Sequence, residues 1–94
     1  MKEFSTNTIF KRKKDLLSSR MDQDTVMMHP LSGKYFSLNP VATSIWEMLE
    51  VPLTFDKIVE NLLTEFDVTI VVCQNETNKF LQTLIEKDII EIQG

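Results

Sequence analysis

The chain has 94 residues, of which 43% are hydrophobic and 26% charged, and its formal net charge at pH 7 is −4. This length is enough for one small domain with a modest core, but not for a deep, enclosed active site. No apolar run is long enough to cross a bilayer, and the acidic balance argues against a nucleic-acid surface, which is built from Lys and Arg contacts to phosphate.

The charges are unevenly distributed along the chain. Residues 1–20 hold six basic and two acidic side chains, a net charge of +4, whereas residues 21–94 have a net charge of −8. The basic run at residues 11–14 is interpreted as a solvated segment that precedes the domain, with a small nucleic-acid-binding or membrane-binding patch as the alternative. We therefore predict a flexible basic arm over residues 1–14, with a little extended structure near residues 8–10, followed by one domain over residues 15–94.

Three short strands are predicted over residues 16–20, 25–29 and 34–38. The aspartates within residues 22–24 supply the chemistry of the first turn, and residues 30–33 form a second turn of hairpin length. Successive strands with such short connections predict an antiparallel meander. In that order the third strand lies at an edge of the sheet.

A helix is predicted to follow the third strand without an intervening loop. Asn39 is a favourable N-cap, and Pro40 suits the first helical position because its missing N–H would have no partner there. Pro52 ends the helix, since the residue before a proline is disfavoured in the α region. The apolar side chains that follow helical spacing, and so form a core face, are Ala42, Ile45, Trp46 and Leu49.

Two further helices and an extended tail complete the predicted order. Thr54 caps the second helix, and Thr69 caps a third helix that begins near residue 70 and ends near residue 87. The β-branched residues within 68–73 favour a strand by local propensity, but the apolar residues after them continue at helical spacing. Residues 89–92 are predicted as a terminal extended tail, which gives an α+β fold of three antiparallel strands followed by three helices.

The residue types needed for catalysis or metal binding are scarce. A Cys/His nucleophilic pair would require His29 to meet Cys73, and no acidic residue is spaced to orient the imidazole. Two such ligands cannot complete a tetrahedral zinc site without carboxylates, and no glycine-rich phosphate loop is present. We expect no catalytic residue, no metal and no cofactor. The single cysteine and the lack of an apolar export segment at the start favour a cytoplasmic location.

The segment over residues 24–46, DTVMMHPLSGKYFSLNPVATSIW, strongly resembles the PqqD family, named for coenzyme PQQ synthesis protein D. The hallmarks are a hairpin turn ending in Gly-Lys-Tyr, then Leu-Asn-Pro, a small residue at position 42, and Ile-Trp followed by Leu49. The resemblance covers about residues 16–92. The chain departs from the family pattern at Val51-Pro52, where the family often has a glycine, and at Glu76, which only approximately matches an acidic position early in the third helix.

The resemblance implies a fold, a partner and a site. The family consists of RiPP recognition elements, small winged-helix-like domains that bind the leader of a ribosomally made precursor peptide and present it to a modifying enzyme or leader peptidase. The leader adds as a further strand to the open edge of the third strand, beside the third helix, a mode for which an edge strand and apolar pockets are suited. Transferred to this sequence, the edge is Lys34, Tyr35, Phe36, Ser37 and Leu38, and the cleft wall is Thr77, Phe80, Leu81 and Leu84.

Some of these apolar residues are also what a core needs, so backbone pairing along residues 34–38 is the firmer expectation, with Tyr35 as the first choice for a side-chain contact. The pattern is closest to the stand-alone domains of lasso-peptide clusters. The alternatives are a PQQ or radical-SAM peptide-modification pathway and a winged-helix DNA-binding regulator, the latter disfavoured because Lys79 and Lys87 are opposed by nearby acids. We expect no nucleic-acid or membrane partner, while the open strand edge makes a homodimer possible.

Overall fold

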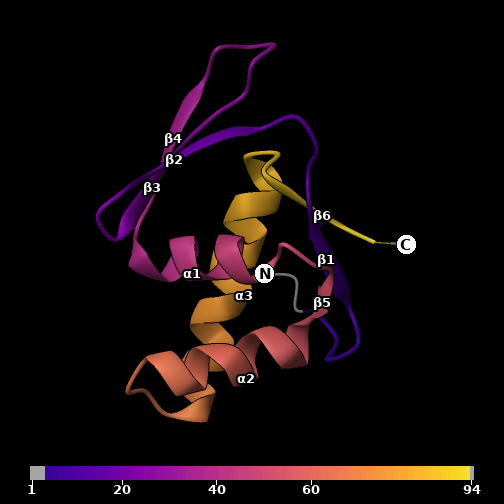
Figure 1. Ribbon diagram of the computed structural model, residues 1–94. Coiled ribbons are helices and arrows are strands. Elements are labelled where there is room, and N and C mark those ends of the chain that lie inside the picture. Colours follow the sequence, from indigo (N-terminus) through magenta and orange to yellow (C-terminus); the bar gives the residue numbers. More distant parts are fainter. Residues whose placement is uncertain (1–3, 94) are drawn as a thin grey trace.

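The structure is a computed structural model that describes residues 4–93 (Figure 1). Two small antiparallel sheets, in the strand orders β2-β3-β4 and β5-β1-β6, accompany three helices. In the view of Figure 1, α1 and α3 lie between the two sheets and α2 lies below them. The elements, in chain order, are β1 (Ile9–Arg12), β2 (Leu17–Met21), β3 (Asp24–Met28), β4 (Tyr35–Leu38), α1 (Pro40–Met48), β5 (Leu53–Thr54), α2 (Phe55–Glu65), α3 (Ile70–Glu86) and β6 (Ile90–Ile92).

The predicted meander is confirmed. Strands β2, β3 and β4 pair antiparallel in sequence order, so β4 and β2 are the two edges. The β3–β4 turn is closed by the N–H of Gly33, which donates to the carbonyl of His29 at 2.7 Å. Gly33 adopts a positive φ of 71°, a conformation that glycine reaches without the steric cost of a Cβ.

The three predicted helix starts are confirmed by their caps. The side chains of Asn39, Thr54 and Thr69 accept from the backbone N–H groups of Ala42, Lys57 and Val72 respectively. Helix α1 ends at Met48, before Pro52, and α3 runs through the β-branched segment at residues 70–72 as a helix. Tertiary packing of the later turns thus decides the structure of that segment against its local propensity.

The cap of α1 supplies a stability prediction. The Oδ1 of Asn39 accepts from the N–H of Ala42 at 2.9 Å, and this bond satisfies one donor that the first helical turn leaves free. Replacing Asn39 by alanine should therefore lower the free energy of unfolding by about 1 kcal/mol. Urea unfolding of Asn39→Ala, with Asn39→Asp as the variant that keeps a capping oxygen, measures this; equal losses in both variants would exclude the cap as the cause.

The N-terminal segment differs from the predicted flexible arm. Residues 9–12 form β1, the central strand of the second sheet, and Phe10 is completely buried in the core. Strand β1 pairs with β5 through Phe10 and Leu53 and with β6 through Phe10 and Ile92. The arm prediction is therefore wrong for this strand; residues 1–3 of the arm and residue 94 lie outside the described residues.

The predicted terminal tail is also part of the fold. Residues 90–92 form β6 against β1, and Ile89 and Ile90 are buried. The second sheet thus joins the two ends of the described chain around one core. Most core side chains come from the helices, and β1, β3, β4 and β6 each add at least one.

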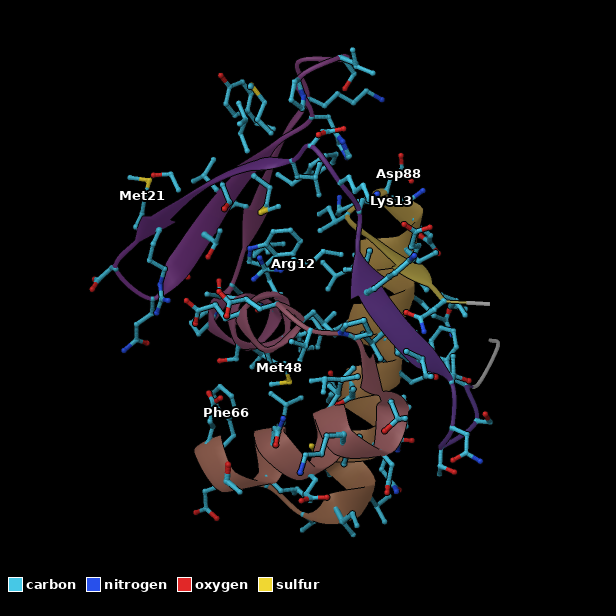
Figure 2. The ribbon with its side chains drawn as sticks, turned by 45° about the vertical axis from the view of Figure 1, so that its right-hand side comes forward. Arg12, Lys13, Met21, Met48, Phe66 and Asp88 are labelled. Carbon is cyan, nitrogen blue, oxygen red and sulfur yellow. The ribbon has the colours of Figure 1, made fainter. Side chains whose placement is uncertain are left out.

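Arg12 connects the second sheet to α1. Its Nε and Nη2 donate to the carbonyl oxygen of Trp46 at 3.0 and 2.7 Å, and its guanidinium carbon lies 4.0 Å from the centroid of the Trp46 ring. Figure 2 shows Arg12 directed into the space between α1 and the meander. Burial lowers the pKa of Arg12 from its usual value, and the carboxylates of Glu50 and Glu47 oppose this shift. One cation of the basic run is therefore used to hold the end of α1 rather than to meet a partner.

Candidate functional site

The open edge of β4 is the first component of the site. Strand β4 pairs with β3 on one side, and in the described chain no strand pairs with its other side. The N–H of His29 donates to the carbonyl of Lys34 at 3.0 Å, so this position is a hydrogen-bonded one in the ladder. Because bonded and non-bonded positions alternate in an antiparallel pair, Phe36 and Leu38 bond to β3, whereas the N–H and C=O groups of Tyr35 and Ser37 point to the open edge.

The backbone of Lys34 does not belong to this set. Its carbonyl accepts from His29, and its N–H donates to the Oγ of Ser32 at 3.3 Å. Of the five residues predicted to form the edge, Tyr35 and Ser37 therefore supply the free polar groups.

The side chains of β4 divide between the two faces of the sheet. Leu38 is buried and Phe36 half-buried on the inner face, opposite Thr25 and Met27. Tyr35 is 71% exposed and shares the outer face with Ser37, because successive strand residues point to opposite sides. Tyr35 thus lies on the face turned away from the core, and of the predicted edge side chains only Phe36 is both inward and accessible.

Helix α3 presents less surface than the predicted cleft wall required. Thr77, Leu81 and Leu84 are 1%, 0% and 2% exposed, so they are core residues. Phe80 is half-buried and packs at the margin of the core. The residues whose helical spacing predicted this helix are therefore mostly residues that pack in the core.

A groove of about 720 Å³ lies where β4 begins, between the β3–β4 turn, the link from β1 to β2 and the end of α3. We call it the hairpin groove; the residues used below are Lys13, Lys14, His29, Lys34, Phe36 and Lys87. The Nε2 of His29 and the carbonyl oxygen of Lys87 are 2.9 Å apart, a hydrogen bond that requires the imidazole to donate. The Nζ of Lys87 lies 5.0 Å from the centroid of the Phe36 ring, so turn, strand and helix meet here.

A second, smaller hollow of about 300 Å³ lies near the middle of α3, and we call it the apolar pocket. Val41 from α1, Phe66 from the end of α2, and Val72 and Phe80 from α3 are among the residues that line it. Figure 2 shows Phe66 at the end of α2. Phe36 and Phe80, the two half-buried members of the predicted set, therefore lie in different hollows, one at the start of β4 and the end of α3 and the other near the middle of α3.

Several lining residues were missed in the sequence interpretation. His29, Lys87 and Val41 carry no motif, and their role depends on which elements the fold brings together. The Gly33-Lys34 pair that ends the turn was the one local signal that pointed to the groove.

The two residues considered for nucleophilic chemistry are in separate places. His29 borders the hairpin groove, whereas Cys73 is buried beside the apolar pocket, with its Sγ 3.8 Å from the carbonyl oxygen of Val59. Within residues 4–93, no cluster of three or more His, Cys, Asp or Glu side chains is arranged to hold a metal. Nor does any helix in this part of the chain have the length and apolar character needed to cross a membrane.

Comparisons with known proteins identify the family of the chain. The family model described as coenzyme PQQ synthesis protein D (PqqD) matches residues 24–90. Among solved structures, the chain described as "TbiB1 in Complex with the TbiA(beta) Leader Peptide" is similar, with a TM-score of 0.78 and 28% identity, covering 86% of this chain and 94% of that one. No curated protein matches the chain. The family match spans β3 and β4 of the meander, all three helices and the start of β6, and the chain belongs to the PqqD family.

Proposed function

We propose that the chain is a non-catalytic recognition element that binds the leader of a ribosomally synthesised precursor peptide. The leader adds as a strand to the open edge of β4, and the chain then delivers it to a modifying enzyme or leader peptidase, in lasso-peptide biosynthesis. The observation that carries the proposal is the set of outward N–H and C=O groups on Tyr35 and Ser37, in a strand that lines the hairpin groove through Phe36 and leads to Val41 of the apolar pocket. The likeness to TbiB1, a chain solved with a leader peptide, supports it.

The chemistry of such binding follows from the two faces of the edge. Backbone hydrogen bonds to Tyr35 and Ser37 supply affinity with little dependence on the sequence of the peptide. Inward side chains of the peptide meet Phe36 and Phe80, whereas outward ones lie beside Tyr35. Leu38, Thr77, Leu81 and Leu84 act from the core, where they hold the strand and the helix in place.

The other edge of the meander is a poorer site for the same peptide. All five residues of β2 are exposed, and neither hollow is lined by a residue of β2. A peptide added to β2 would meet the exposed side chains of Leu17 and Met21 but would enter neither hollow, so it would lack the recessed pockets that read alternate side chains of an added strand. The β4 edge is the one that we assign to the leader.

The direct test is a titration of the chain with the leader of a short precursor encoded beside its gene. A labelled peptide should bind saturably at one peptide per chain, while a scrambled peptide and duplex DNA should not bind. Addition of the complex to the peptidase encoded in the same cluster should accelerate leader removal. Binding to DNA alone, lost steeply with salt, would replace the proposal by a regulatory function on the same fold.

A further inference from the structure

The hairpin groove holds three lysines that form no ion pair within the described residues: Lys14, Lys34 and Lys87. Elsewhere most basic side chains are engaged. Arg20, Lys57 and Lys79 pair with Glu47, Glu60 and Glu76 respectively, and Arg12 is bound to the carbonyl of Trp46. Within residues 4–93, the unpaired lysines of this chain, whose net charge is −4, thus lie largely in one groove.

The acids of the same groove do not cancel these lysines. Asp15, Glu86 and Asp88 also line it, but Asp88 is paired with Lys13 at 3.2 Å, and Figure 2 shows these two side chains together at the end of α3. Four lysines and three acids give the lining a formal net charge of +1. It is therefore positive on a protein that is acidic as a whole.

The positions of the lysines relate them to the open edge. Lys34 directly precedes β4, and the ammonium of Lys87 lies over the Phe36 ring on the inner face of that strand. The hydrogen bond between His29 and the Lys87 carbonyl holds the end of α3 against the β3–β4 turn. A strand added to β4 must pass over or beside these cations as it reaches the Tyr35 end.

We propose that the hairpin groove binds carboxylate side chains of the leader, which makes acidic residues a specificity determinant of the peptide. This inference rests on the proposed function. Antiparallel pairing is slightly the more stable arrangement, and it places the C-terminal part of the paired segment at the Tyr35 end of β4. The acidic residues are therefore expected just C-terminal to the segment that pairs, where Lys14, Lys34 and Lys87 face them.

The test compares two double variants with the same change of net charge. Lys34→Glu with Lys87→Glu reverses two groove lysines, whereas Lys57→Glu with Lys79→Glu reverses two lysines outside it. Each is titrated with the leader encoded beside the gene and with a form in which every Asp and Glu is replaced by Asn or Gln. Because exposed ion pairs are individually weak and screened, low salt is used and the expected loss for the groove variant is roughly tenfold.

The control variant should change affinity by less than about twofold, a change within the range of long-range charge effects. The leader with Asn and Gln in place of its acidic residues should bind the parent more weakly, and its affinity should be the same for the two variants. Lys87 follows α3 directly, so its reversal can also weaken the helix end; the pair Lys14→Glu and Lys34→Glu leaves the helix unchanged and should show the same loss.

The outcomes separate this inference from the proposed function. The carboxylate site alone is overturned if the groove variant and the control bind the leader equally well and Ser37→Pro, at the β4 edge, still weakens that binding. Failure of the parent chain to bind the leader overturns both. A loss of affinity in the groove variant that persists with the Asn/Gln form of the leader also contradicts carboxylate recognition, since that peptide has no side-chain carboxylate for the lysines to bind.

Discussion

Replacement of Ser37 by proline should weaken leader binding by at least about tenfold while the chain stays folded. The N–H of Ser37 points to the open edge of β4, so proline removes one donor to the added strand and puts a ring where its carbonyl must approach. The lost hydrogen bond is worth roughly 1 kcal/mol, the ring adds a steric cost, and tenfold in affinity corresponds to about 1.4 kcal/mol. Titration with the labelled leader measures the change.

The fold should tolerate this proline because no bond of the β3–β4 ladder is lost. Proline occurs on edge strands where its position faces solvent, and Ser37 is exposed. Circular dichroism and thermal unfolding check this directly. Ser37→Ala, which removes the hydroxyl but keeps the N–H, should bind as the parent does.

The meander provides a matched control on its other edge. Ser18 in β2 is also an exposed serine, and it lies opposite Met27 at a position where the strands are not bonded, so its N–H points to the open side of β2. Ser18→Pro should leave leader affinity unchanged. If Ser18→Pro bound the leader weakly and Ser37→Pro bound it as the parent does, the leader would lie on β2, and the assignment of the site to β4 would be refuted.

The parts of the fold that could be predicted from the sequence are those with local signals. Asn39, Thr54 and Thr69 each precede a helical pattern, and a capping side chain acts within three residues of its own position. The meander was equally predictable, because its strands are joined by turns of two to six residues whose composition itself indicates a turn. Nothing in these predictions required knowledge of distant contacts.

The second sheet could not be predicted in the same way. Strand β1 pairs with Leu53 and with Ile92, which are more than 40 and 80 residues away in the sequence. Its neighbours on the chain are mostly polar or basic, so the composition of residues 1–14 obscures the single aromatic residue that is buried. The predicted terminal tail lacked its partner for the same reason.

The candidate site shows a similar division. The open edge followed from the order of the strands, but accessibility within it depends on the ladder and on the faces of the sheet. Thr77, Leu81 and Leu84 share the helical spacing of Phe80, and only packing against the other elements distinguishes them from it. The groove lysines were hidden because Lys14, Lys34 and Lys87 come from three separate segments.

Replacement of Phe10 by alanine should lower the free energy of unfolding by about 3–5 kcal/mol. Phe10 is completely buried in the middle strand of the second sheet, and its ring meets the Phe4 ring edge to face at a centroid distance of 4.9 Å. Truncation removes this contact and leaves a cavity between elements that cannot all close on it. Urea unfolding measures the loss.

This result discriminates sharply between a flexible arm and a structural strand. In an arm, Phe10→Ala would change stability by no more than an exposed substitution does, within about 0.5 kcal/mol. Lys14→Ala provides that reference, since Lys14 lies four residues further along the same basic segment and is exposed. Small domains have about 5–15 kcal/mol of stability, so a loss of 3–5 kcal/mol can leave a large unfolded fraction, and Phe10→Leu keeps a measurable folded population. A Phe10→Ala loss no larger than that of Lys14→Ala would show that β1 contributes nothing to the core, because a fully buried aromatic ring cannot be truncated without cost.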